Sequence, residues 1–399
     1  MADNKDKKVL NVPALRFPEF TREWKEHYLA EYLDFKNGLN PSANKFGSGV
    51  KFISVMDILN NDFITYDCIR TSVEITPEEQ VAFVVEKGDM LFQRSSETLE
   101  DVGRANVYMD NRPAVFGGFV IRGKKKAEYN PMFFRYLLAS PYARKKIIPM
   151  GAGAQHFNIG QDGLSKVKLH FPILQEQQKI AALLRLIDER IATQNKIIEK
   201  LETLIKGIVE LAFSHAATSN TLGCYITQIS QRNKLGKNLP VLSVSNKHGF
   251  VEQSEQFEDR IIASDDTSNY KIVNINDFAY NPARINVGSI ARLKNKKCGI
   301  VSPMYICFRT LGNIIPEYLE LFFKTKQFSF EVNKRLEGSV RLCLQYEGLC
   351  EIVIPVLPVE KQQIWITRIT ALYDKLAIEK GLQNNYQVQK QFLLSLMFI

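Results

Sequence analysis

The sequence lacks the segments that mark secreted and membrane proteins. Its first residues, MADNKDKKVLNVPALRF, are charged and contain no apolar core, so they do not resemble a secretory signal peptide. No apolar run approaches the roughly 20 residues that a membrane-spanning helix needs. We therefore expect a cytoplasmic protein with no membrane contact.

The sequence also lacks the patterns of metal and disulfide sites. No cysteine forms a Cys-x-x-Cys pair, and none has a histidine at zinc-ligand spacing. This pattern predicts no metal and no cofactor. It predicts reduced thiols at Cys68, Cys224, Cys298, Cys307, Cys343 and Cys350.

Catalytic signatures are missing as well. There is no Gly-x-x-x-x-Gly-Lys-Ser/Thr phosphate loop. Residues 46–49 (FGSG) lack the Phe-x-Gly-x-Gly spacing of a cofactor loop, and residues 281–284 (NPAR) lack the second proline and the ring of an adenine-methyltransferase loop. Glu23 and Lys25 have no suitably spaced aspartate for a nuclease metal site. We predict no catalytic residues.

Positive charge is in surplus. Lys and Arg number 52 against 43 Asp and Glu, which gives a net charge of +9 and a pI of about 9.0. This surplus favours a polyanionic partner such as nucleic acid, although proteins with other functions also reach such a pI. The 399-residue length predicts two or three domains.

Residues 175–214 have the most regular pattern in the sequence and predict one long helix. The segment has no proline, and Gly207 is its only glycine. Its apolar residues recur at alternating steps of four and three, as in a helix that packs along another helix. At about 1.5 Å per residue, such a helix spans about 57 Å. The seam, which Gln194 interrupts, contains Ile180, Leu184, Ile187, Ile191, Ile198, Leu201, Ile205, Ile208 and Ala212.

The expected elements occur in the same order twice. A helix is expected at 23–38, a shorter helix at 131–140, and a Gly-rich turn at 151–159 that leads into a last strand. Other strands are expected at 51–58, 63–69, 81–96, 104–109 and 114–123. Segments that repeat this order lie at 239–246, 273–293, 299–309, 315–323 and 337–364.

Four matched pairs of residues define the repeat. Three of them are separated by 184 residues and the last by 185: Glu176 with Glu360, Gln178 with Gln362, Ile180 with Ile364, and Phe213 with Phe398. This period is too long for a solenoid. It predicts a duplicated two-part unit, a β-rich globule followed by a long helix.

A second long helix is expected at residues 360–398. Its middle, residues 379–391, is polar, so it cannot bury a continuous seam alone. We expect it to pair antiparallel with residues 175–214, and a frayed C-terminal helix is the alternative. Its coiled-coil positions are Ile366, Ile369, Leu376, Leu393 and Met397.

This order, together with several local motifs, resembles the specificity subunits of type I restriction–modification systems. The motifs are VPALRFPEF (12–20), GDMLFQRSS (88–96), GAGAQHFNI (151–159) and NDFAYNPARINVGSI (276–290). The most specific pair is PILQEQQKI (172–180) and PVLPVEKQQI (355–364), because each member enters a long helix. The resemblance covers residues 12–399.

The resemblance implies an α+β fold with two β-rich target recognition domains in tandem. They are expected at 22–174 and 215–359, after an N-terminal tail and arm at 1–21. A long antiparallel two-helix coiled coil, at 175–214 and 360–399, would separate them. The family implies that each domain reads one half of a bipartite double-stranded DNA site. It also implies a non-catalytic chain that binds two modification (methyltransferase) subunits, which ATP-dependent restriction endonuclease subunits can join.

Residues suited to DNA phosphates and base edges lie on the expected loops of both domains. Arg94 and Arg284 are the strongest candidates, because each follows a predicted strand at the same place in its repeat. The first domain offers Lys45, Lys51, Arg94, Ser95, Ser96, Arg104, Gln155, His156 and Asn158. The second offers Lys234, Lys237, Asn281, Arg284, Asn286, Arg292, Lys294 and Arg341.

Two other functions stay open from sequence alone. One is a fused methyltransferase or nuclease, against which the missing motifs argue. The other is a helical scaffold or adaptor whose globular domains bind protein rather than DNA. A salt-steep, sequence-selective affinity for DNA would separate a DNA reader from an adaptor.

Overall fold

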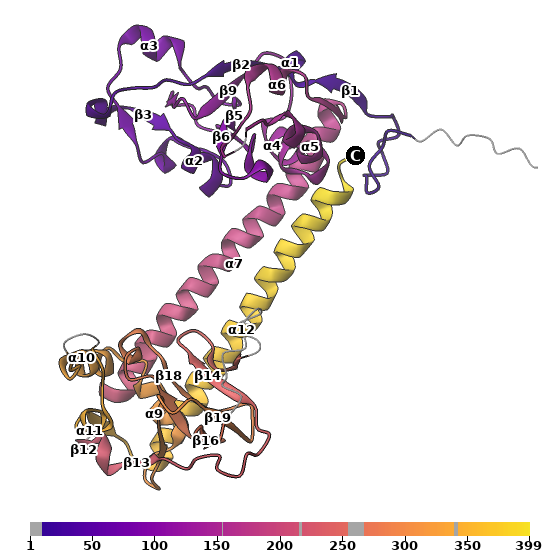
Figure 1. The fold of residues 1–399 in the computed structure, drawn as a ribbon. Helices are drawn as coiled ribbons and strands as arrows, with labels where there is room; N and C mark the ends of the chain where they lie inside the picture. The colour runs from indigo at the N-terminus through magenta and orange to yellow at the C-terminus, as the bar shows by residue number, and fades with distance from the viewer. Residues whose placement is uncertain (1–9, 154, 215–217, 254–266, 339–341) are drawn as a thin grey trace, which may run out of the picture. The chain divides into compact units, whose positions relative to one another are not determined.

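The chain forms two compact units. The computed structural model describes residues 10–153, 155–214, 218–253, 267–338 and 342–399 (Figure 1). The first unit comprises Met1–Asn195 and Gly381–Ile399, and the second comprises Lys196–Lys380. Among the described residues, every helix is too short or too polar to cross a membrane.

Two long helices contribute to both units. Helix α7 (Leu174–Ser214) has 41 residues and helix α12 (Val359–Leu396) has 38, which confirms both expected helices. In the first unit, Asp188 and Asn195 of α7 contact Lys390 and Gln383 of α12 respectively, so these segments are antiparallel (Figure 1). In the second unit, Lys380 of α12 lies 2.7 Å from Glu202 of α7. The polar middle of α12 therefore makes polar contacts with α7 in each unit.

The first unit is built around a four-stranded antiparallel sheet with strand order β2-β9-β5-β7. A three-stranded sheet (β4-β3-β8) and two ribbons (β1-β11 and β10-β6) complete its strands. Their bounds are β1 (Lys25–Tyr28), β2 (Leu33–Asn37), β3 (Phe46–Ile53), β4 (Ser72–Val73), β5 (Met90–Gln93), β6 (Ser95–Ser96), β7 (Ala105–Val107), β8 (Val115–Phe116), β9 (Val120–Lys125), β10 (Phe157–Asn158) and β11 (Lys168–Phe171). The helices are α1 (Leu29–Tyr32), α2 (Val55–Asn60), α3 (Pro77–Ala82), α4 (Pro131–Ala139), α5 (Pro141–Ile147) and α6 (Gln161–Ser165).

Helix α4 holds the core of the first unit together. The Asn130 side chain caps it by accepting a hydrogen bond from Phe133 N, and Pro131 occupies its first turn, where no amide donor is needed. Phe133, Phe134 and Leu137 are fully buried in one cluster with apolar residues of α7 and α12. Burial of each such side chain stabilises the unit by about 1.5–3 kcal/mol, so the two helix ends are part of its core.

The N-terminal arm is tied to the start of α7. Both guanidinium nitrogens of Arg16 lie 2.7 Å from the carboxylate of the buried Glu176. Trp24 Nε1 donates to the same carboxylate at 3.2 Å, and its ring packs against Phe398 near the chain's C-terminal end. The arm therefore closes the first unit over the ends of both long helices.

The second unit contains two four-stranded sheets, β13-β20-β17-β18 and β15-β14-β19-β16, and the ribbon β12-β21. Its strands are β12 (Thr218–Thr221), β13 (Ile226–Ile229), β14 (Val241–Ser245), β15 (Gly249–Glu252), β16 (Lys271–Asn274), β17 (Phe278–Tyr280), β18 (Ile290–Arg292), β19 (Cys298–Val301), β20 (Ile306–Thr310) and β21 (Val353–Val356). Its short helices are α9 (Pro316–Phe322), α10 (Lys326–Lys334) and α11 (Tyr346–Cys350). The core again joins the short helix after the sheet, here α9, to segments of α7 and α12.

The expected alternation of β-rich regions and long helices is confirmed, but several local predictions were wrong. Residues 23–38 form β1, α1 and β2, because pairing with β11 and β9 overrides the helical spacing of their apolar residues. Strand 51–58 ends at Ile53, where Ser54 starts α2 by donating to Asp57. Residues 63–69 contain a 3₁₀ helix at Tyr66–Cys68, and the segment 81–96 begins in α3 before it enters β5 and β6.

A buried glutamine relates the two units and corrects the alignment of the repeat. Gln177 accepts a hydrogen bond from Asn130 N at 3.0 Å and donates to Pro172 O at 2.9 Å. Gln362 accepts from Ile315 N at 2.9 Å and donates to Leu357 O at 2.7 Å. The three atom pairs are each separated by 185 residues, so Gln362 corresponds to Gln177 and not to Gln178.

The other predicted pairs divide in the same way. Ile180 is buried whereas Ile364 is 49% exposed, so that pair is wrong. Phe213 packs on Tyr318 as Phe398 packs on Phe133, which supports the pair separated by 185.

Candidate nucleic-acid interface

In the first unit, a short polar ribbon gathers several predicted DNA contacts. Strand β6 pairs with β10, so Ser95 lies opposite Asn158, and Ser96 lies opposite Phe157. Ser95 Oγ is hydrogen-bonded to the side chain of Asn158. The motifs at 88–96 and 151–159 are therefore brought together, although they are far apart in the sequence.

Arg94 lies at the base of this ribbon and is held there by the backbone. Its amide donates to Phe119 O at 2.9 Å, and its carbonyl accepts from Ile159 N at 3.0 Å. Its guanidinium donates to Gly118 O at 3.2 Å and is partly exposed. One edge of the guanidinium is thus satisfied within the protein, which fixes the direction of the side chain.

The Gly-rich turn next to β10 exposes polar side chains. Gln155 and His156 are exposed, and Asn158 Nδ2 donates to His156 O at 3.3 Å. Gly153 has φ of +147°, and a Cβ there would lie 2.0 Å from His156 O. Only glycine fits this close backbone approach, which explains part of the Gly-rich motif.

Arg104 joins the same cluster, because its carbonyl accepts from Gln93 N at 2.8 Å. Its side chain is 54% exposed and lies 2.6 Å from Asp101. Arg144 supports this loop from below by donating to the carbonyls of Glu100 and Val102. Burial lowers the pKa of Arg144 to about 10, so its guanidinium stays charged at neutral pH.

Lys45 and Lys51 lie outside this cluster. Lys45 ends a 3₁₀ helix before β3, and its carbonyl accepts from Glu74 N. Lys51 Nζ donates to Ile69 O at 2.7 Å and faces the Tyr66 ring. Lys51 is therefore engaged in holding its own loop.

The second unit places its candidates in three regions. Asn281 is buried and accepts from Ala283 N, whereas Arg284 and Asn286 in the following turn are exposed. Arg284 follows the end of β17 by four residues, whereas Arg94 follows β5 directly, so their places in the repeat differ.

Lys234 and Lys237 are exposed in a separate loop. The Asn233 side chain shapes it by donating to Lys237 O and accepting from Lys237 N. Arg341 lies outside the described residues.

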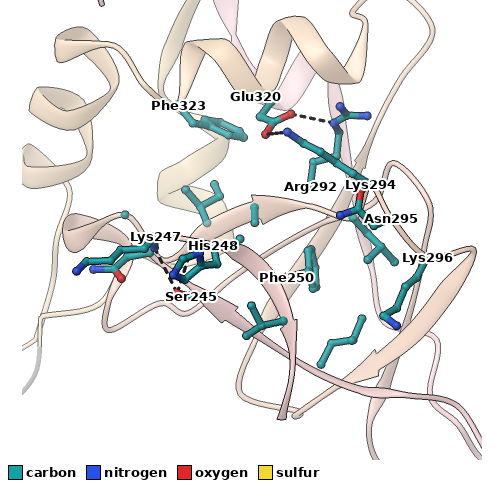
Figure 2. Close-up of a pocket in the computed structure, with 18 of the residues that line it drawn as sticks. Ser245, Lys247, His248, Phe250, Arg292, Lys294, Asn295, Lys296, Glu320 and Phe323 are labelled. Carbon is teal, nitrogen blue, oxygen red and sulfur yellow. Dashed lines mark hydrogen bonds and ion pairs between the residues drawn. The ribbon is translucent and has the colours of Figure 1, made fainter. Parts of the chain in front are cut away.

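Arg292 and Lys294 line a pocket of about 590 Å³ (Figure 2). Arg292 lies 2.6 Å from Glu317 and 3.1 Å from Glu320, and its side chain is only 9% exposed. Lys294 lies 2.5 Å from Glu320. Arg292 is therefore bound within the protein, and only Lys294 of the two has a largely exposed side chain.

The pocket also has a wall that our sequence analysis missed. The turn between β14 and β15 places Ser245, Lys247 and His248 on the side opposite Lys294 and Lys296 (Figure 2). Ser245 Oγ accepts from the backbone amides of Lys247 and His248, which shapes the turn. A polar tetrapeptide between two β-rich runs was the available signal for this hairpin.

The two seams of predicted coiled-coil residues are buried or half-buried. Those below one-tenth exposure are Ile180, Leu184, Ile187, Ile198, Ile205, Ala212, Ile366, Ile369, Leu376, Leu393 and Met397. Ile191, Leu201 and Ile208 are half-buried, and Gln194 is buried.

Comparisons with known proteins agree with this architecture. Residues 21–203 match the family described as the type I restriction modification DNA specificity domain. Over 97% of its length, the chain is 22% identical to the MjaX type I restriction enzyme specificity subunit of Methanocaldococcus jannaschii and covers 95% of that protein. It is 24% identical to the MjaVIII specificity subunit of the same organism, over 48% of this chain and 46% of that one.

Solved structures share the fold. The S subunit of a type I restriction–modification system from M. genitalium is 16% identical, with a TM-score of 0.57 over 97% of this chain and 99% of that one. The HsdS subunit from Thermoanaerobacter tengcongensis is 14% identical, with a TM-score of 0.50 over 93% of this chain and 95% of that one. The chain belongs to the family of type I restriction–modification specificity subunits.

Proposed function

We propose that this chain is the DNA sequence-recognition subunit of a type I restriction–modification complex. The observation that carries the proposal is the repeated frame. Gln177 and Gln362 make the same hydrogen bonds in two units, while the loops around each frame differ. A shared frame with different loops suits a protein that reads two different DNA half-sites.

Each β-rich region, residues 22–174 and 215–359, reads one half of a bipartite, asymmetric double-stranded site. In the first region, Arg94, Ser95, Ser96, Arg104, Gln155, His156 and Asn158 supply phosphate and base contacts. In the second, Arg284, Asn286, Lys234, Lys237 and Lys294 do so. Arg292 and Lys51 are withdrawn from the proposal because internal contacts occupy them.

The helix pair, residues 175–214 and 360–399, fixes the spacer between the half-sites and docks two modification subunits. Its seam residues pack inward, and α7 keeps a second apolar stripe outside. Ile197 is 36% exposed, Leu204 49% and Leu211 45%. They recur every seven residues, which is the spacing of a helix that binds another helix.

The chain itself is non-catalytic in this proposal. The modification subunits supply methyl transfer, and restriction subunits with an ATP-dependent endonuclease can join the complex. The similarity to specificity subunits over nearly the whole chain disfavours the adaptor alternative.

Selection from a library of randomised duplexes tests the proposal. The full chain, purified with its modification subunits, is incubated with the library, and the bound duplexes are sequenced. The proposal predicts one motif made of two short specific segments and an unspecified spacer. Recovery of no motif, or of one continuous segment, would contradict it.

A further inference from the structure

The two units each expose one large apolar side chain at a turn between strands. In the first unit, Phe119 lies between β8 and β9 and is 67% exposed. In the second, Met304 lies between β19 and β20 and is 57% exposed. The residues beside them, Gly118, Val120 and Tyr305, are buried, so these side chains stand out from packed backbone.

Strand pairing shows that the two positions are equivalent. Phe116 of β8 pairs in parallel with Ile53 of β3, and Val301 of β19 pairs in parallel with Leu242 of β14. The separation between Phe116 and Val301 is 185 residues, which is also the separation between Phe119 and Met304.

The strands that follow keep the same register. Ile121 of β9 pairs with Phe92 of β5, and Ile306 of β20 pairs with Tyr280 of β17. The intervening turns therefore have equal length. Single exposed apolar residues are common, but one at the same position of both copies calls for a shared cause.

Both turns are firmly held. Gly117 N donates to Ile53 O at 3.0 Å and Gly118 N to Leu39 O at 2.9 Å. In the second unit, Tyr305 OH accepts from Val244 N, and Lys271 Nζ donates to Tyr305 O at 2.6 Å. A side chain on such a turn is presented without a large ordering cost on binding.

The apolar side chains also lie beside the polar DNA candidates. Phe119 O accepts from Arg94 N, and Gly118 O accepts from the Arg94 guanidinium. Met304 precedes Ile306 by two residues, and the partner of Ile306, Tyr280, is followed by Asn281 and Arg284. Each unit thus combines one apolar side chain with cationic and amide groups at one edge of a sheet.

We propose that Phe119 and Met304 each pack against the bases of the half-site that their own unit reads. This inference rests on the proposed function. Phe and Met are among the apolar side chains that DNA-binding proteins insert between base steps, and apolar groups also contact the thymine methyl. The polar candidates cannot supply such a contact, and a protein–protein role would not require the two side chains to lie beside the candidate base readers.

Binding of the selected duplex by Phe119→Ala and Met304→Ala tests the inference. The full chain, with its modification subunits, is titrated with that duplex and with a scrambled duplex. We expect each variant to bind the selected duplex about tenfold more weakly, because one good base contact discriminates by about 1–3 kcal/mol. Affinity for the scrambled duplex should stay unchanged, and Phe119→Leu should keep most of the binding.

Matched controls separate a base contact from general surface effects. Val81→Ala in the first unit and Phe330→Ala in the second remove side chains that are 77% and 67% exposed. Neither control should change DNA binding, and all four alanine variants should keep the unaltered Tm. If the unaltered chain selects no duplex, the proposed function fails. If it selects one and both variants bind it as tightly as the unaltered chain does, this inference alone fails.

Discussion

Asp188 of α7 and Lys390 of α12 form an ion pair within the first unit, with Oδ1 and Nζ 2.5 Å apart. Tyr136 OH donates to the other carboxylate oxygen at 2.7 Å, and Arg135 lies 3.6 Å away. Burial and the hydrogen bond to Asp188 raise the pKa of Tyr136 above its ordinary value, so its phenol stays protonated. The polar part of α12 is therefore specifically matched to α7 at this point.

Replacement of Asp188 by alanine should destabilise the first unit. Lys390 and Arg135 would lose their shared carboxylate, and removal of one partner from a buried ion pair costs about 3 kcal/mol. The measurement is the free energy of unfolding of the full chain in denaturant. As a control, Glu189→Ala removes a half-exposed carboxylate paired only along the helix with Arg185, and should cost about 0.5 kcal/mol or less. Equal effects of the two variants would contradict the matched role of Asp188.

The buried glutamines should contribute equally to their units. Gln177→Ala and Gln362→Ala each leave a buried backbone amide and a buried carbonyl without their partner, at a cost of about 1–3 kcal/mol. Gln178→Ala and Gln363→Ala remove exposed neighbours and should change stability by about 0.5 kcal/mol or less. Thermal unfolding of the four variants checks this. A large effect at Gln178 and none at Gln177 would restore the alignment that we rejected.

His170 should make stability depend on pH. Burial and the nearby Lys146 lower the pKa of His170 below its ordinary value, and Tyr142 OH lies 3.1 Å from its Nδ1. The unfolded chain then binds a proton more readily than the folded chain, so stability is full above the ordinary histidine pKa and falls as the pH falls below it. His170→Gln should lessen the loss of stability between neutral and mildly acidic pH, measured by denaturant unfolding. The exposed His248 gives the control: if His248→Gln flattens the pH dependence as much, burial of His170 is not the cause.

Arg94 and Arg284 should affect different halves of the DNA motif. Each guanidinium lies in a different unit, so Arg94→Ala should relax sequence preference in one half and Arg284→Ala in the other. Loss of a base contact costs about 1–3 kcal/mol of discrimination at one position, whereas loss of a phosphate contact weakens binding uniformly and lowers the salt dependence. Duplex selection with each variant, and with the exposed Arg185→Ala as control, measures this. Changes in the same half from both variants would contradict separate readers.

The long-range plan of the chain could be predicted from its sequence because it depends on periodic apolar residues. Helix α7 begins one residue before the predicted start and ends at the predicted residue. Helix α4 was predicted at 131–140 and spans Pro131–Ala139, since its apolar residues, capping asparagine and first-turn proline all favour a helix.

What could not be predicted depends on distant pairing partners. Leu29 and Leu33 have helical spacing, yet they lie in α1 and β2 because the flanking segments join two different sheets. Arg292 has the residue type and loop position of a DNA contact, but Glu317 and Glu320, more than twenty residues later, bind it. Phe119 and Met304 read as core residues in sequence, and only the strand register places them on the surface.

Methylated adenines, mapped in a genome that expresses this chain with its modification subunits, give the most direct test of the central claim. The same map is made for a chain with one heptad inserted in both α7 and α12. Seven residues add about 10 Å of helix, which corresponds to about 3 base pairs. We predict a bipartite motif whose spacer lengthens by about that amount while both half-sites keep their sequences. Altered half-sites with an unchanged spacer would contradict the account.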